Sequence, residues 1–275
     1  MKLWIQALSV LLPVAYLGAA VLCGMAFAGP RQPSISRLRG AAVHGVLALH
    51  VAYFALQGRA SASFPVAGTW LVLSAVALAT TLLFAGITWR APQPSVGSIV
   101  LLLVTALQLC ASAFGPLQPL AAGPADAFRI LHVSTTVVAS AALVLSGVYG
   151  FLHILLYRQM RARRFGPLFQ QLPDLEQLAR SLRRAALAGF LLLTVGLNLG
   201  IAMAHQLDVR GFHYRDPHVL LTLLLWVHFG VIAFSRRIRG FSARRASFAA
   251  AAGLVTLLAI LFLTLVPRFT FHAFG

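Results

Sequence analysis

The chain alternates between long apolar runs and short polar gaps. Eight stretches free of charged residues occupy 3–28, 41–58, 66–89, 97–116, 130–157, 185–204, 218–235 and 246–267. A transmembrane helix needs roughly 20 mostly apolar residues. The pattern therefore predicts an all-α fold, a polytopic integral membrane helical bundle with about eight transmembrane helices. No boundary separates a soluble part from a membrane part, so we expect residues 1–275 to form a single domain.

The first apolar run admits a second interpretation. Lys2 precedes it, and small residues close it near Gly29, as in a cleaved secretory signal peptide. Cleavage would leave seven spans instead of eight. We favour the interpretation in which the first run is a membrane span.

Composition supports a membrane protein and argues against a nucleic-acid partner. Hydrophobic residues make up 60% of the chain and charged residues 10%, with a mean hydropathy of +0.87. So little polar surface cannot cover a soluble globule. The formal charge of +17 would suggest nucleic acid if it formed one patch, but the basic residues are scattered between apolar runs.

Basic residues fall mainly in alternate loops. One set of loops holds 16 of the 22: Arg31, Arg37, Arg39, Arg90, Arg158, Arg161, Arg163, Arg164, Arg180, Arg183, Arg184, Arg236, Arg237, Arg239, Arg244 and Arg245. The other 6 are Lys2, Arg59, Arg129, Arg210, Arg215 and Arg268. Because cytoplasmic loops are enriched in Lys and Arg, we expect a multi-pass protein of the cytoplasmic (inner) membrane. Both termini should lie on the outer, periplasmic side.

The longest polar segment, 158–184, should contain a short amphipathic helix on the cytoplasmic face that leads into the sixth span. Asp174 and Glu176 follow Pro173, a favourable arrangement for a helix start. Glu176 and Arg180 are four residues apart and can form an ion pair. Five acidic residues exist in the chain, none of them inside an apolar run, which disfavours an acid-relay pump. Cys23 and Cys110 are expected to pack as small hydrophobic residues.

Nine histidines are the main candidates for chemistry. The topology places His132 just inside the outer end of the fifth span and His272 just past the outer end of the eighth. A neutral imidazole can bind haem iron. Arg129 precedes His132 by three residues and Arg268 precedes His272 by four, so each arginine could reach a haem propionate from the same helix face. The alternative is that both histidines are hydrogen-bonding residues at helix interfaces.

The remaining histidines have simpler expected roles. His205, His213 and His218 surround the last outer loop, where a zinc site is one interpretation and a solvated loop the default. His44 and His50 are six residues apart and face different directions on a helix. We expect His153 and His228 to be hydrogen-bonded inside the bundle.

Four segments resemble the cytochrome c assembly protein family, membrane proteins that handle haem and include the CcsA, HemX and YpjD types. Residues 131–134, Leu-His-Val-Ser, are similar to the family's His-Val-Ser-Met-Met segment. Residues 172–176, followed by 192–197, resemble the family's inner loop and next helix. Residues 238–246 are close to its Gly-Trp-Arg-Gly-Arg-Arg-Ala loop, and 272–275 to its closing His-Ser-Tyr-Gly.

The resemblance implies a haem-handling role in cytochrome c biogenesis rather than enzymatic turnover. It implies that His132 and His272 are outer-face ligands of haem b bound non-covalently. It also implies membrane lipid, haem, apocytochrome c and other cytochrome c assembly proteins as partners. The alternatives are a HemX-like accessory or regulatory membrane protein that binds no haem, and a small-molecule transporter.

The chain departs from the haem-exporting members of the family in two places. Those members carry a tryptophan-rich outer loop, whereas residues 207–218 contain no tryptophan. They also place a histidine eight residues after a tryptophan, and counting from Trp226 gives Phe234. The shorter, accessory-type members are the closer likeness.

Overall fold

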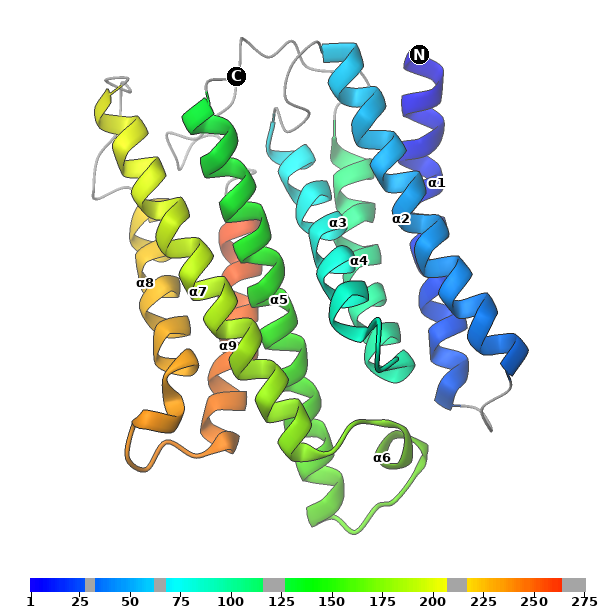
Figure 1. Ribbon diagram of the computed structural model, residues 1–275, viewed down its shortest axis with the longest axis vertical. Helices are drawn as coiled ribbons and strands as arrows, with labels where there is room; N and C mark the ends of the chain where they lie inside the picture. The colour runs from blue at the N-terminus through cyan, green and yellow to red at the C-terminus, as the bar shows by residue number, and fades with distance from the viewer. Residues whose placement is uncertain (28–32, 62–67, 116–126, 207–216, 264–275) are drawn as a thin grey trace. The chain divides into compact units, whose positions relative to one another are not determined.

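Helices account for all the regular secondary structure that the computed structural model describes, in residues 1–27, 33–61, 68–115, 127–206 and 217–263. The elements are α1 (Lys2–Gly24), η1 (Met25–Phe27), α2 (Pro33–Ser61), α3 (Thr69–Thr88), α4 (Pro94–Phe114), α5 (Ala127–Arg161), α6 (Pro167–Gln171), α7 (Leu175–Gln206), α8 (Pro217–Ala233), η2 (Ser235–Arg237) and α9 (Ala243–Leu263). Figure 1 labels the α-helices along the chain.

Each predicted span coincides with a helix. Seven helices are long and apolar enough to cross a membrane, namely α1, α2, α3, α4, α5, α7 and α9. The seventh predicted span corresponds to α8, which has 17 residues and so reaches the lower limit of about 17 for a membrane-crossing helix. The prediction of an all-α polytopic membrane bundle is confirmed.

Two compact units can be distinguished. The first unit comprises Met1–Gly123 and Leu155–Leu175, and the second unit comprises Pro124–Ile154 and Glu176–Gly275. The long helix α5 contributes its first 28 residues, 127–154, to the second unit and its last turns to the first. The expected single domain stays a prediction.

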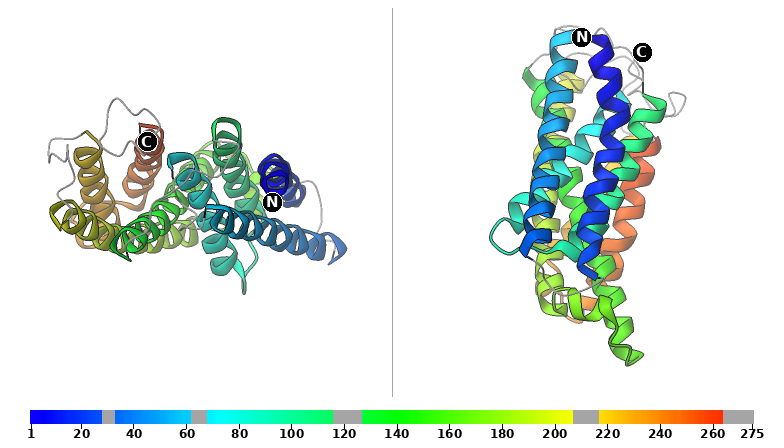
Figure 2. Two further views of the ribbon diagram at one scale, coloured as in Figure 1. Left: turned by 90° about the horizontal axis from the view of Figure 1, so that it is seen from above. Right: turned by 90° about the vertical axis from the view of Figure 1, so that its right-hand side faces the viewer.

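In the first unit, α1 packs against α2 and α4, and α3 packs against α4. These helices run side by side with alternating direction (Figures 1 and 2). Leu12, Tyr16, Val76 and Val100 are fully buried between them. Large apolar side chains on the outer faces, such as Val14, remain exposed, as expected for helices that face lipid.

The second unit consists of most of α5 together with α7, α8, η2 and α9, and glycines let three of its helices approach closely. A Cβ atom on Gly189 of α7 would collide with Leu143 of α5, and a Cβ on Gly150 of α5 would lie 2.8 Å from the backbone oxygen of Ser247 on α9. Small residues at such contacts allow helix backbones to pack tightly within a membrane. α5, α7 and α9 therefore meet along a tightly packed seam.

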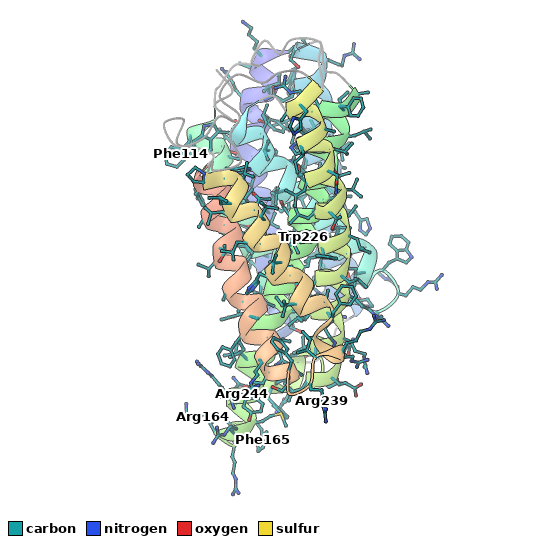
Figure 3. The ribbon with its side chains drawn as sticks, turned by 90° about the vertical axis from the view of Figure 1, so that its left-hand side faces the viewer. Phe114, Arg164, Phe165, Trp226, Arg239 and Arg244 are labelled. Carbon is teal, nitrogen blue, oxygen red and sulfur yellow. The ribbon has the colours of Figure 1, made fainter. Side chains whose placement is uncertain are left out.

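The arginine-rich end of the second unit is formed by the start of α7, η2 and the start of α9. Figure 3 shows Arg239 and Arg244 at this end and Trp226 farther along α8. The predicted pair is present, with Arg180 Nη1 donating to Glu176 Oε1 at 2.5 Å. The amphipathic segment is continuous with the span, because α7 begins at Leu175 and runs to Gln206. The ion pair and the continuity with the span are confirmed, whereas the cytoplasmic position of the segment stays a prediction.

Candidate functional site

His132 lies in the second turn of α5, where it contacts α7. Its Nδ1–H donates to the carbonyl oxygen of Gly196 over 2.8 Å. A carbonyl oxygen can only accept, so Nδ1 must carry the proton, and in the neutral ring the lone pair then belongs to Nε2. The bond to Gly196 therefore does not use the Nε2 lone pair. This tautomer is compatible with metal binding through Nε2, because histidine ligands often donate their other nitrogen to a backbone carbonyl.

Two glycines on α7 create the space that the His132 ring occupies. A Cβ on Gly200 would lie 2.7 Å from His132 Cε1 and 3.0 Å from Nδ1. One turn earlier, a Cβ on Gly196 would lie 2.6 Å from the Cγ2 of Thr136. One turn of α5, from His132 to Thr136, thus packs against the two glycines of α7. A larger residue at position 200 would displace the imidazole. The resemblance already covered 192–197, but sequence reasoning gave no role to either glycine.

Arg129 stands where the sequence predicts it, three residues before His132 in the first turn of α5 and partly buried. Residues three apart share a helix face, so the guanidinium and the imidazole emerge on the same side of α5. The predicted partners His272 and Arg268 lie outside the described residues. The approach of His272 to His132 therefore stays a prediction.

The other histidines of the second unit differ in how their rings are bonded. His228 Nε2–H donates to the carbonyl oxygen of Ala249 on α9 over 2.8 Å, so its expected hydrogen bond is confirmed. His153 is only 4% exposed, and its Nδ1 has no hydrogen-bond partner among the described residues. We expected His153 to be hydrogen-bonded inside the bundle, and for its Nδ1 atom this prediction is wrong.

A metal centre at the last outer loop finds no support in the described part of the chain. No group of three potential metal ligands occurs there. His205 is exposed near the end of α7 and His218 is partly buried at the start of α8. His213 lies outside the described residues. Cys23 is buried and Cys110 partly so, both as free thiols.

An aromatic cluster occupies the position at which the haem-exporting relatives would carry a further histidine. Phe190 of α7 stacks on Trp226 of α8 with ring centroids 5.2 Å apart, and it meets Phe234 edge-on at 5.9 Å. Trp226 Nε1–H donates to Thr194 Oγ1 over 2.7 Å. Phe234 thus packs against Phe190 in an apolar contact, and its phenyl ring has no atom that could bind haem iron.

The first unit contains a hydrogen-bonded chain that crosses all four of its long helices. His50 Nε2 lies 2.9 Å from Ser74 Oγ, which donates to Gln108 Oε1 over 2.8 Å. Since the Ser74 proton is committed to Gln108, Nε2–H of His50 must be the donor to Ser74. His50 Nδ1 then accepts from the Tyr16 hydroxyl over 2.8 Å. His50 is fully buried and both of its nitrogens are satisfied, which no sequence pattern indicated.

His44 is the contrasting histidine of α2. It is exposed, and its Nδ1–H donates to the carbonyl oxygen of Gly40 one turn earlier on the same helix, over 2.8 Å. Its ring also meets Trp89 edge-on at 5.8 Å. The expected separation of His44 and His50 onto different faces is confirmed, because one is solvent- or lipid-facing and the other is buried.

These features define a multi-pass α-helical membrane protein in which His132, near the start of α5, is hydrogen-bonded to α7. The sequence profile described as Cytochrome C assembly protein matches residues 35–270, and the chain belongs to that family. Membership supports a role in the assembly of cytochromes c. A curated relative, Protein HemX of Brevibacillus brevis, is 28% identical over 111 residues. That match spans 40% of this chain and 40% of the relative.

Proposed function

We propose that the chain is a haem-binding component of cytochrome c assembly, with haem b held non-covalently between His132 and His272 as axial ligands. Arg129 and Arg268 would hold the two propionates through charge-assisted hydrogen bonds. The protein would bind and present haem without turning over a substrate. Apocytochrome c and other assembly proteins are the partners that this role requires.

The observation that carries the proposal is the tautomer of His132. Its Nδ1–H is committed to the Gly196 carbonyl, so Nε2 keeps its lone pair. Histidines that bind metals characteristically donate their other nitrogen to a carbonyl or carboxylate in this way. Because Gly200 has no side chain, the His132 ring can pack directly against the backbone of α7. A histidine that only bridged α5 and α7 would make the same hydrogen bond and keep the same lone pair, so the two roles are separated by haem binding itself.

The proposed orientation places this site on the outer side of the inner membrane. The loops and helix starts with 16 of the 22 basic residues would face the cytoplasm. The beginnings of α5 and α8, and both chain termini, would then lie on the outer side, where cytochromes c receive haem according to the family resemblance. Cysteine accessibility at Ser61 and Ser242, each replaced by cysteine in the full chain, tests this orientation with a membrane-impermeant thiol reagent. We expect labelling of S61C but not S242C in intact spheroplasts, and the reverse pattern contradicts the orientation.

A visible spectrum of the full chain, purified in mild detergent from cells supplied with haem, tests ligation. We expect a Soret band and sharp α and β bands on reduction, as for a six-coordinate b-type haem. His132→Gly should remove most of the bound haem, and added imidazole should restore it by occupying the vacated ligand position. His44→Gly is the matched control because His44 is exposed and bonded only to its own helix.

His272→Ala separates the two ligands. If His272 is the second ligand, this variant should retain a weaker, five-coordinate spectrum while His132→Gly with imidazole stays six-coordinate. A colourless wild-type protein, or an unchanged spectrum in His132→Gly, contradicts the ligand assignment.

A HemX-like accessory protein that binds no haem is the second candidate. It is favoured by the similarity to Protein HemX over 111 residues. Under this function His132 bridges α5 and α7, so His132→Gly should lower stability without changing any spectrum. The same purification therefore distinguishes the two candidates.

A further inference from the structure

A polar side chain lies on an outward face of the membrane-crossing helix α7. Asn198 is the single asparagine of the chain and stands six residues before the end of the apolar run 185–204. Its side chain is exposed. Polar groups inside the membrane are costly unless they are paired, and asparagines in membrane spans form hydrogen bonds across helices. An outward-facing asparagine at this depth therefore calls for a partner helix.

The hydrogen bond that Asn198 makes within its own helix uses only part of its bonding capacity. Its Nδ2–H donates to the carbonyl oxygen of Thr194, one turn earlier on α7, over 2.7 Å. A carboxamide has two N–H donors and an oxygen with two lone pairs. This bond uses one donor and leaves the second N–H and Oδ1 to other groups. Because these two are a donor and an acceptor, one asparagine complements another.

The residues around Asn198 have the spacing of a helix–helix interface. Ala188, Leu191, Val195, Asn198 and Ala202, which we call the α7 seam, follow one another at intervals of alternately three and four residues. This period of 3.5 residues is that of side chains that interlock between two paired helices. Leu191 is 54% exposed and Val195 49%, Ala188 and Asn198 are also exposed, and Ala202 is partly buried. The seam is thus a continuous outward strip along α7.

The neighbours of α7 within the second unit contact other faces of this helix. Gly196 and Gly200 face α5, and each is two residues from Asn198, which places them about 160° away around the helix. Phe190 stacks on Trp226 of α8 and lies about 80° from Asn198, on the side opposite to the rest of the α7 seam. In the described part of the chain, α5 and α8 therefore leave the seam uncovered.

We propose that the α7 seam is a dimerisation surface, on which two copies of this chain pack their α7 helices in parallel around a reciprocal pair of Asn198 side chains. Two copies inserted in the same orientation are related by a twofold axis, which brings each seam residue against its equivalent. The second N–H and Oδ1 of each Asn198 then satisfy those of the other. Ala188 and Ala202 let the helix backbones approach closely.

A second copy is the occupant that this chemistry favours. A carboxamide is complementary to itself, and it carries no charge that would select an oppositely charged partner. A single polar residue in an apolar seam also fixes the register of two paired helices. The α7 seam faces away from His132, because the glycines that contact the His132 turn lie on the opposite side of α7. Dimerisation is therefore separate from haem binding.

Energy transfer between donor-labelled and acceptor-labelled full chains in liposomes tests the dimer, with the protein-to-lipid ratio varied. We expect transfer that rises with this ratio and saturates, as for a monomer–dimer equilibrium. Asn198→Leu should weaken dimerisation about tenfold, as for the loss of a hydrogen-bonded pair within a membrane. Asn198→Gln should retain most of the affinity because it keeps a carboxamide. A chain that stays monomeric at every ratio overturns the proposal.

Thr256→Leu on α9 is the matched control. The Thr256 hydroxyl donates to the carbonyl oxygen of Ala252 on its own helix over 3.2 Å, as the Asn198 amide does on α7. The control thus removes a polar group from another membrane-crossing helix, and dimerisation should change less than twofold. Equal weakening by Thr256→Leu and Asn198→Leu contradicts the assignment of the interface to the α7 seam.

Disulfide cross-linking in native membranes locates the interface with Asn198 left in place. Leu191→Cys and Val195→Cys are each introduced singly into a full chain whose two native cysteines are replaced by alanine, and copper phenanthroline is the oxidant. We expect covalent dimers of both variants. Val227→Cys is the control, because Val227 is 53% exposed but lies on α8, and it should stay monomeric. Cross-linking of Val227→Cys in place of the two seam variants, or of none of the three, overturns the proposal.

Discussion

The two units differ in how the histidines at their helix contacts are hydrogen-bonded. In the first unit, His50 uses both ring nitrogens to bond side chains from two other helices, Tyr16 of α1 and Ser74 of α3. In the second unit, His132 bonds one backbone carbonyl through Nδ1, and the Nδ1 of His153 has no partner in the described ranges. His50 thus uses both nitrogens to hold helices together, whereas His132 makes one such bond and the Nδ1 of His153 makes none with the described residues.

This difference separates a structural role from a binding role. A fully satisfied buried network rigidifies the helices that it joins, and removing one member leaves the others unpaired. A histidine with a free lone pair or an unpaired N–H contributes less to stability and can exchange partners. Function should therefore be more sensitive to substitution in the second unit, and stability more sensitive in the first.

The largest expected effect is on stability, from His50→Leu. The substitution removes two hydrogen bonds from a residue with no exposure and leaves the Tyr16 hydroxyl and Ser74 without their partner. We expect a loss of about 2–4 kcal/mol in the free energy of unfolding. Reversible unfolding of the full chain in mixed detergent and sodium dodecyl sulfate micelles measures this loss.

His44→Leu is the matched control on the same helix, since His44 is exposed and bonded only to Gly40. Its effect should stay below about 0.5 kcal/mol. His132→Leu should fall between the two, near 1 kcal/mol, because it loses a single hydrogen bond at a partly buried position. If His132→Leu destabilises the chain as much as His50→Leu, the contrast between the units does not hold.

The membrane architecture could be predicted because it depends on local patterns. Runs of apolar residues and alternating arginines lie directly in the sequence, and all eight predicted spans coincide with helices. The Glu176–Arg180 pair was predictable for the same reason, since its spacing lies within one helix. The shared helix face of Arg129 and His132 follows from the same spacing rule.

Contacts between helices could not be predicted in this way. The His50 network joins residues 34 positions apart on each side, from Tyr16 to His50 and from Ser74 to Gln108. Nothing in the pattern of a single helix indicates which serine faces which histidine. The surroundings of Gly200 and His153 could not be predicted for the same reason. Gly200 matters because it has no side chain against α5. His153 is notable because its Nδ1 has no hydrogen-bond partner among the described residues.

The second prediction concerns haem binding and uses Gly200→Ala. An added Cβ would lie 2.7 Å from His132 Cε1, so the imidazole must shift away from α7 and its bond to Gly196 must lengthen or break. We expect haem content to fall several-fold and the reduced-state bands to broaden, with a loss of about 1–3 kcal/mol in stability. Visible spectra and unfolding curves of the same samples measure both effects.

Gly45→Ala is the control for the second prediction. Gly45 lies within α2, and a methyl group added there would have nothing within 4 Å, so alanine should stabilise the helix by up to about 1 kcal/mol. The spectrum should not change. Unaltered haem content in Gly200→Ala would mean that the position of the His132 ring does not matter for binding, and it would remove the main support for the ligand assignment.

The smallest expected effect comes from Glu176→Gln, which breaks the ion pair at the start of α7. Both side chains are largely exposed, Arg180 at 42% and Glu176 at 69%, and such pairs contribute about 0.5 kcal/mol or less. Stability should therefore hardly change. Reversible unfolding in the same mixed micelles measures this effect, and a large loss of stability would place this surface pair with the His50 network as a structural element.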